Sequence, residues 1–154
     1  MPNGIFKVPE PINERVRNYA PGTRERADLQ AEIKRLRSQV LDIPMVIGGK
    51  EVRTDKKVSI HPPHEHQYLL GHYHKGDASH VKMAMDAALE AKEKWAKLSW
   101  EHRASIFLKA ADIIAGPLGD TVNAATMLGQ SKNVMQAEID SACEMADFLR
   151  FNVK

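Results

Sequence analysis

The sequence has little cysteine, no long apolar run and no excess of charge of one sign. Cys143 is the only cysteine in 154 residues, which excludes an internal disulfide and fits a reducing compartment. No apolar run approaches the roughly 20 residues that a membrane-spanning helix needs. The chain has 22 basic and 20 acidic residues, a formal net charge of +2. This balance gives no electrostatic footprint for nucleic acid or an anionic membrane, so we expect neither as a partner.

Self-contained phosphate and metal motifs are also missing. The sequence contains neither Gly-x-Gly-x-x-Gly nor Gly-x-x-x-x-Gly-Lys-Ser/Thr, and neither Cys-x-x-Cys nor His-Glu-x-x-His. The stretch 129–132, Gly-Gln-Ser-Lys, precedes a predicted helix, and a turn between two helices is the simpler interpretation. We therefore assign no cofactor-binding and no metal-binding residue within the chain.

The composition is that of a globular protein: 43% of the residues are apolar and 27% are charged. Four prolines in residues 1–22 predict an extended arm that lies on a larger surface, and residues 23–154 form the remainder. The first 24 residues contain no serine but two glutamates, which is not typical of a transit peptide. We expect no targeting segment there.

The first part of residues 23–154 predicts one helix and a β region. Leu29, Ile33, Leu36 and Val40 form a narrow apolar stripe, which predicts an amphipathic helix over residues 23–41 docked on a core. A coiled-coil or partner-binding helix is the alternative, but sustained heptads are lacking. Two glycines in Gly48-Gly49-Lys50 predict a hairpin between strands at 44–47 and 51–53, because glycine accepts positive φ. Two further strands are expected at 57–60 and 67–71.

Four helices are predicted to follow. Asp77 or Ser79 is expected to cap the first of them, and Ser99 the second. The second helix is apolar on more than one side and should be well buried. Gly116 and Gly129 are expected stops. The four predicted ranges are 77–95, 100–115, 118–128, and from residue 131 or 133 to at least 151.

Five of the seven histidines fall in one stretch: His61, His64, His66, His72 and His74. Three such imidazoles could hold zinc. The simpler interpretation is an exposed, solvated hairpin edge, so a metal-binding protein is kept only as an alternative function. A metal site would give a stoichiometric heat on zinc titration that His72→Ala abolishes.

Two residues of the last helix invite a chemical interpretation. Cys143 could be a nucleophile, but no nearby cation or helix start is evident to lower its pKa, so a small packing residue is favoured. Glu138 shares a face with Met135, Ala142 and Met145. A buried carboxylate must find a cation, a donor or a proton. Glu138 either faces a pocket and meets a substrate cation or a water, or it pairs internally and fixes helix packing.

The residues resemble the N-terminal part of an aldehyde dehydrogenase, and most closely the subfamily of 1-pyrroline-5-carboxylate dehydrogenases (glutamate γ-semialdehyde dehydrogenases). The resemblance covers nearly the whole chain and is weakest before Tyr19 and through the histidine-rich hairpin. The stretches that carry it are 24–30, 81–88, Trp95, 103–117, 127–132, 136–140 and 148–152.

The resemblance implies an α/β fold and an NAD-dependent oxidation of L-glutamate γ-semialdehyde to L-glutamate in proline catabolism. In that family a cysteine thiolate attacks the aldehyde, hydride passes to NAD, and a water activated by a general base releases the acid. Those catalytic residues and the NAD-binding residues lie beyond the position of Lys154, and Cys143 does not match the nucleophile. Glu138 matches a helix glutamate that lines the substrate pocket near the amino end of the semialdehyde.

The resemblance also implies that residues 23–154 form an incomplete NAD-binding domain whose parallel sheet is largely missing. The whole enzyme is expected to be a homo-oligomer, mitochondrial if eukaryotic and cytoplasmic otherwise. We expect the isolated chain to be inactive and to bind a hydrophobic dye or aggregate, because its apolar stripes would lack their partner sheet. The alternative is a non-enzymatic helical interaction module, which would need a polar outer face on each helix.

Overall fold

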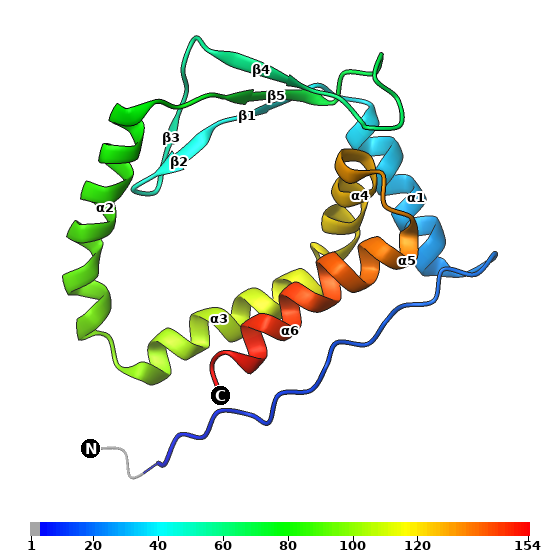
Figure 1. Cartoon of the computed structure of the whole chain (residues 1–154). Helices are drawn as coiled ribbons and strands as arrows, with labels where there is room; N and C mark the ends of the chain where they lie inside the picture. The colour runs from blue at the N-terminus through cyan, green and yellow to red at the C-terminus, as the bar shows by residue number, and fades with distance from the viewer. Residues whose placement is uncertain (1–3) are drawn as a thin grey trace.

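A computed structural model describes residues 4–154 and combines two small sheets with a series of helices (Figure 1), so the predicted α/β class is confirmed. Residues 1–3, the first part of the predicted arm, lie outside the described residues. None of the helices described in residues 4–154 is long and apolar enough to cross a bilayer. The elements in chain order are α1 (Arg24–Arg37), β1 (Leu41–Ile43), β2 (Met45–Ile47), β3 (Lys50–Val52), β4 (Lys57–Ile60), β5 (Gly71–His74), α2 (Ala78–Lys97), α3 (Trp100–Ala115), α4 (Gly119–Gln130), α5 (Val134–Ala137), the π-helix η1 (Glu138–Cys143) and α6 (Glu144–Phe151).

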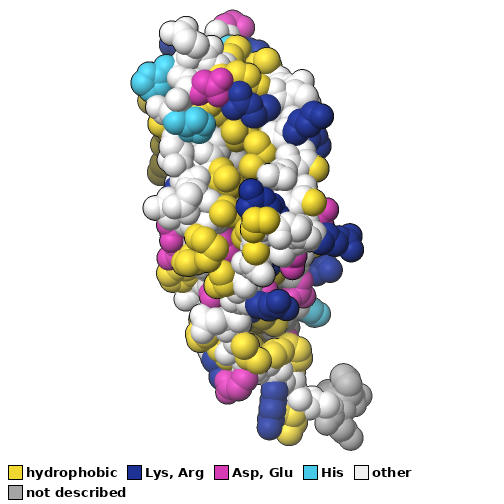
Figure 2. All heavy atoms as spheres, turned by 90° about the vertical axis from the view of Figure 1, so that its right-hand side faces the viewer, with side chains coloured by type: hydrophobic (Ala, Val, Ile, Leu, Met, Phe, Trp, Pro, Cys, Tyr) yellow, Lys and Arg dark blue, Asp and Glu magenta, His cyan; other side chains and the backbone are white. Residues whose placement is uncertain are grey.

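The main core lies between α1 and α4. Leu29 and Leu36 of α1 are buried together with Tyr19, Ala124 and Leu128. Thr23 caps α1 by accepting a hydrogen bond from the backbone N–H of Arg26. Figure 2 shows the side of the molecule on which α1 lies in Figure 1, where apolar side chains lie between basic and acidic ones.

The predicted end of the first helix, at residue 41, is wrong. The helix stops at Arg37, and Ser38 makes its C-cap. Leu41 then begins a strand, because its N–H donates to the carbonyl of Leu70 and β1 pairs in parallel with β5. Val40, the last member of the predicted stripe, is 59% exposed. Pairing with a strand 30 residues further along the chain therefore ends the helical pattern early.

The two sheets are small. The first has the order β1-β5-β4, with β1 parallel and β4 antiparallel to the central strand β5. The second is the predicted hairpin of β2 and β3, whose loop residues Gly48 and Gly49 have φ of +58° and +76°. The strand predicted at 67–71 begins only at Gly71. Leu70 lies just before this strand and packs in the core with residues of α1 and α4, which explains why an apolar residue occupies the position.

Helices α2 and α3 form as predicted, but their apolar side chains are far less buried than those of α1. Asp77 caps α2 in a capping box with His80, yet none of the residues of α2 is buried. Ser99 caps α3, where only Ala104 and Ala111 are buried. The expectation that α3 is well buried is wrong, since Ile106 is 50% and Phe107 40% exposed. The reason is that the described helices packing on α3, chiefly α6, cover only one of its apolar sides.

The last helices contain two departures from the predicted pattern. Gly129 does not end α4, which continues to Gln130; Ser131 makes the turn with φ +58°. The next helix begins after Asn133, which forms a capping box with Gln136. It runs through η1 into α6, so the predicted single helix contains a π-helical segment from Glu138 to Cys143.

The arm has no helix or strand between residues 4 and 20. It runs alongside α6 and α3, so that both ends of the described chain lie in the same region of the molecule (Figure 1). Lys154 at the C-terminus reaches the arm by an ion pair with Glu10 at 2.7 Å.

Candidate functional site

Glu138 is the first residue of η1 and is 1% exposed. A π-helical turn places residues five apart one above the other, and such turns occur often at functional sites. Here the turn brings Cys143 to Glu138, with 3.7 Å between Sγ and Oε1. The sequence predicts that Glu138 lies on an inward face, and the burial of its side chain confirms that part of the prediction.

Four N–H and O–H donors converge on this carboxylate, in addition to the thiol of Cys143. Oε1 accepts from the backbone N–H of Arg17 at 2.8 Å and from its Nε at 3.4 Å. Oε2 accepts from the hydroxyl of Tyr19 at 2.7 Å and from Nδ2 of Asn123 at 2.6 Å. A carboxylate offers about four lone-pair positions, so the acceptor capacity of Glu138 is taken up.

The electrostatics of this cluster keep Glu138 ionised. Burial by itself raises the pKa of the carboxyl group, but the hydrogen bonds from Tyr19, Arg17 and Asn123 and the positive charge of Arg17 outweigh it, and the pKa is lowered. Burial and the neighbouring Glu138 raise the pKa of Tyr19, so its hydroxyl stays a neutral donor. The cluster is therefore a charge-assisted hydrogen-bond network in which Arg17, Tyr19 and Asn123 donate and the Glu138 carboxylate accepts.

Arg17 reaches Glu138 from the arm and joins a second carboxylate on the way. Its Nη1 lies 2.9 Å from Oδ1 of Asp120, at the start of α4. The neighbouring Gly119 leaves room for the guanidinium, because a Cβ at that position would lie 2.8 Å from Nη2 of Arg17. A glycine at the first position of α4 thus lets the arm approach the helix closely.

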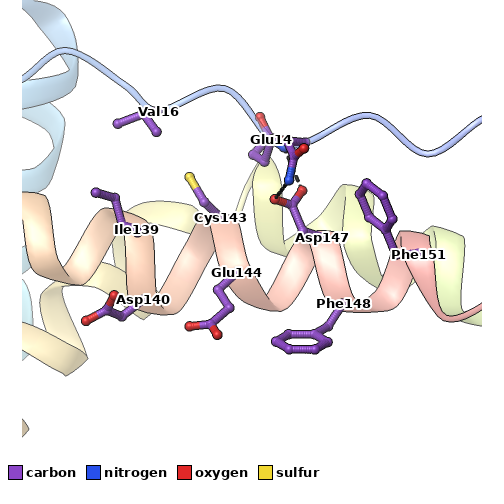
Figure 3. A pocket seen from close by; sticks show the side chains of 10 residues that line it. Glu14, Val16, Ile139, Asp140, Cys143, Glu144, Asp147, Phe148 and Phe151 are labelled. Atoms are coloured by element: carbon purple, nitrogen blue, oxygen red, sulfur yellow. Dashed lines mark hydrogen bonds between the residues drawn. The ribbon is translucent and has the colours of Figure 1, made fainter.

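A groove lies next to the cluster, between the arm and the last helix. It has a volume of about 620 Å³, and Asn13, Glu14 and Val16 of the arm form one wall. In Figure 3 the Cys143 side chain points from the helix toward the arm, and Asp147 points toward Glu14. The helix contributes Ile139, Asp140, Cys143, Glu144, Asp147, Phe148 and Phe151.

Cys143 is buried in this groove as a packing residue, as predicted. Burial, together with the charge and hydrogen bond of Glu138, raises the pKa of its thiol to about 12. A thiolate nucleophile needs the opposite surroundings, with a cation or a helix start next to the sulfur. Cys143 is therefore not equipped for nucleophilic catalysis.

The histidine-rich stretch differs from the predicted exposed edge. His72 and His74 lie on β5, the central strand of its sheet, and His74 is 4% exposed. The ring of His74 accepts a hydrogen bond from the backbone N–H of Thr54 at 2.7 Å, and its Nε2 lies 3.2 Å from Asp42. The edge interpretation fails for these two residues because β1 pairs on the other side of β5. Within residues 4–154, no three His, Cys, Asp or Glu side chains gather in a way that could hold a metal ion.

Within residues 4–154, a strand is followed directly by a helix only at the turn from β5 into α2. Strand, turn and helix follow one another there, as they do at a phosphate site. However, the Asp77 carboxylate accepts from the N–H groups of Ser79 and His80, where a phosphate would bind. A Cβ at Gly76 would meet Sδ of Met45 at 2.8 Å, so this glycine serves packing. This turn does not fit a dinucleotide.

Sequence reasoning identified Glu138 but missed its partners Arg17, Tyr19 and Asn123. Asn123 gives a weak signal, as a polar residue before two alanines in a helix, whereas nothing in the arm sequence distinguishes Arg17 or Tyr19. Glu138 faces the arm network and is not among the residues lining the groove. Its role as a substrate-pocket residue stays a prediction.

Comparison with known proteins gives a consistent result. The model of the aldehyde dehydrogenase family matches residues 51–154. The chain is 47% identical over 149 residues to Delta-1-pyrroline-5-carboxylate dehydrogenase from Agaricus bisporus, covering 96% of this chain and 27% of that protein. It is 42% identical over 147 residues to the mitochondrial Delta-1-pyrroline-5-carboxylate dehydrogenase of Dictyostelium discoideum, covering 96% and 26%.

A solved structure agrees with these relatives. The crystal structure of the Delta-pyrroline-5-carboxylate dehydrogenase from Mycobacterium tuberculosis bound with NAD superimposes with a TM-score of 0.95 at 45% identity, covering 98% of this chain and 28% of that one. The predicted match to part of that fold is thereby confirmed. The chain spans about a quarter of the length of the curated relatives it matches.

Proposed function

The chain belongs to the aldehyde dehydrogenase family, and we propose that it is part of an NAD-dependent enzyme that oxidises L-glutamate γ-semialdehyde, the open form of 1-pyrroline-5-carboxylate, to L-glutamate in proline catabolism. The observation that carries the proposal is the match to the Mycobacterium tuberculosis enzyme, at 45% identity and a TM-score of 0.95 over 98% of this chain. An unrelated activity would not require so close a match along the whole chain.

The catalytic and NAD-binding residues of such an enzyme would be residues other than those described. The one cysteine has a raised pKa, and the β5–α2 turn does not fit NAD. When bound, NAD would accept the hydride of the substrate, and the residues that hold it would lie outside this chain. We therefore expect the isolated 154-residue chain to have no dehydrogenase activity.

The contribution of the chain would be structural. Val81, Met85 and Leu89 recur along α2 and are 60–62% exposed, and Ile106 of α3 is 50% exposed. Apolar helix faces of this kind pack against a sheet in α/β proteins. We propose that α2 and α3 cover the parallel sheet of the nucleotide-binding domain. The alternative of an independent helical module requires polar outer faces, whereas α2 exposes the apolar side chains of Val81, Met85 and Leu89.

The remaining parts of the proposal concern substrate and assembly. Glu138 would meet the amino end of the semialdehyde, which requires one of its four donors to yield its place. The whole enzyme would be a homo-oligomer. It would be mitochondrial if eukaryotic, as the Dictyostelium and mouse relatives are named, and cytoplasmic otherwise.

Complementation tests the proposal directly. The 154-residue chain is co-expressed with a Mycobacterium tuberculosis enzyme shortened by the segment that matches this chain. NADH formation is then measured with 1-pyrroline-5-carboxylate as substrate. We expect activity only when both parts are present. The control is the same shortened enzyme co-expressed with its own missing segment; activity with that segment but not with this chain would refute the proposal.

A further inference from the structure

The arm is attached to the body of the protein in an unusual way. Between residues 4 and 19 of the described chain, no backbone group pairs with a backbone group of a helix or strand. Several attachments are instead made to carboxylate side chains of the last helices, and two ion pairs join Glu10 and Glu14 of the arm to Lys154 and Arg150. Asp147 accepts from Nδ2 of Asn13 at 2.8 Å and from the N–H of Glu14 at 2.6 Å, and Glu138 accepts from the N–H of Arg17. The arm is thus held at separate points and not along a continuous ladder.

The attachment points of the arm fall into two groups, one before Asn18 and one after it. Tyr19 is 7% exposed and belongs to the core around α1 and α4, so it stays in place when that core is intact. Residues 13–17, which we term the strap, lie before Asn18, whose side chain is exposed. If the strap leaves, Glu138 keeps Tyr19 and Asn123 as donors but loses the two donors of Arg17. The carboxylate would not be left bare, so opening of the strap does not require the core to unfold.

The strap lies directly over Cys143. The carbonyl oxygen of Arg15 is 4.0 Å from Sγ, and Val16 and Glu14 flank the thiol in Figure 3. Asn13, Glu14 and Val16 of the strap also form one wall of the groove, so the groove exists only while the strap is docked.

We propose that residues 13–17 form a strap that opens and closes over Cys143 as one unit, with Glu138 and Asp147 as its two catches and Asn18 as its hinge. Each of these carboxylates accepts a hydrogen bond from a backbone N–H of the strap. Glu138, which we term the inner catch, also accepts one from the guanidinium of Arg17, and Asp147 is termed the outer catch. Arg150 strengthens the outer catch by binding Glu14 at 2.7 Å and lying 3.9 Å from Asp147.

The charges around the inner catch come from three directions. The arm supplies Arg17 and Glu14, α4 supplies Asp120, and α6 supplies Asp147. Tyr19, Asn123 and Cys143 complete the surroundings as neutral groups, and α3 makes no hydrogen bond to Glu138 among residues 4–154. Arg17 is the cation of the strap that binds Glu138, and removing it weakens the inner catch from the strap side.

The single cysteine makes the proposal testable without any ligand. Cys143 of the 154-residue chain is labelled with a neutral disulfide reagent under native conditions, and amide hydrogen exchange is followed in parallel. Arg17→Ala should raise the labelling rate tenfold or more. It should also raise exchange at the amides of residues 14 and 17, while amides within α1 and α4 stay within about twofold. Removing a cation does not lower the pKa of a nearby thiol, so a change in that pKa would not explain faster labelling.

Arg15→Ala is the matched control, because it removes the same charge from an exposed neighbour that does not bind Glu138. It should label at the wild-type rate. Unchanged labelling in Arg17→Ala, equal acceleration in both variants, or exchange that rises in α1 and α4 together with the strap would each overturn the proposal. If Arg17→Ala does not fold, Asp147→Asn decides in its place: the amide of Glu14 should lose protection before any amide of α4, and the reverse order would refute the strap.

Discussion

Helices α1 and α2 began from similar sequence patterns and reached opposite environments. Both are amphipathic, and both start at a side-chain cap, Thr23 or Asp77. Yet Leu29 of α1 is 3% exposed, whereas Leu89 of α2 is 62% exposed. The difference shows that an apolar stripe predicts a helix that needs a partner but does not identify the partner. α1 finds α4 and Tyr19 within the described chain, whereas α2 contacts little beyond the β2–β3 hairpin.

The largest effect should come from truncating one leucine in each region. Leu29→Ala should lower the free energy of unfolding by about 2–4 kcal/mol, because it leaves a cavity in the α1–α4 core. Leu89→Ala should change it by less than about 0.5 kcal/mol. Urea unfolding monitored by circular dichroism measures both. Equal losses would mean that α2 is covered in solution, and repeating the measurement at several protein concentrations would show whether self-association covers it.

Two glycines of α4 sharpen the comparison within one helix. Gly119→Ala should destabilise the protein by about 1–2 kcal/mol, because the new methyl group displaces the guanidinium of Arg17 from its carboxylates. Gly129→Ala meets nothing within 4 Å. It should stabilise the helix by about 0.5–1 kcal/mol, since alanine loses less backbone entropy. Thermal melting of the two variants gives the sign of each effect, and a neutral Gly119→Ala would show that Arg17 is not held closely.

A pH titration should have a smaller effect than these substitutions, and it should affect the arm but not α2. The folded-state pKa of Glu138 lies below its ordinary value of 4.5. Its ionised form therefore contributes stability that is fully present above that value and is lost as the pH falls through the lowered pKa. Amide exchange in the arm and in α4 should rise across this window, and Glu138→Gln should flatten the response. A response of equal steepness in Glu138→Gln would assign the pH dependence to other carboxylates.

The smallest effect concerns the cap of α2. Asp77→Ala removes the acceptor for the N–H groups of Ser79 and His80. We expect the first turn of α2 to fray, with faster amide exchange there and no change in α1 or α4, because α2 has no buried residue to transmit the loss. Ser99→Ala at the start of α3 is the matched control. A lower melting temperature of the whole chain in Asp77→Ala would show that α2 is coupled to the core.

Local chemistry explains which predictions were confirmed. The caps at Asp77 and Ser99 and the glycine loop at 48–49 depend on hydrogen bonds and dihedral angles within a few residues, so the sequence contains the necessary information. β1 and β5 were missed or shifted because each depends on pairing with a strand about 30 residues away. The burial of α3 was overestimated because burial requires a partner and not only an apolar side chain.

The candidate site divides in the same way. The spacing along the last helix predicted that Glu138 shares an inward face with Met135, Ala142 and Met145. Glu138 and Ala142 are buried, but Met135 and Met145 are 45% and 50% exposed, so the prediction is correct for the carboxylate and wrong for the two methionines. The π-helical turn that stacks Cys143 on Glu138, and the arrival of Arg17 and Tyr19 from about 120 residues earlier, depend on the path of the arm across the folded body. The sequence by itself therefore determined that a carboxylate would be buried here. Only the tertiary structure decided which donors keep it charged, since those donors come together only when distant segments pack.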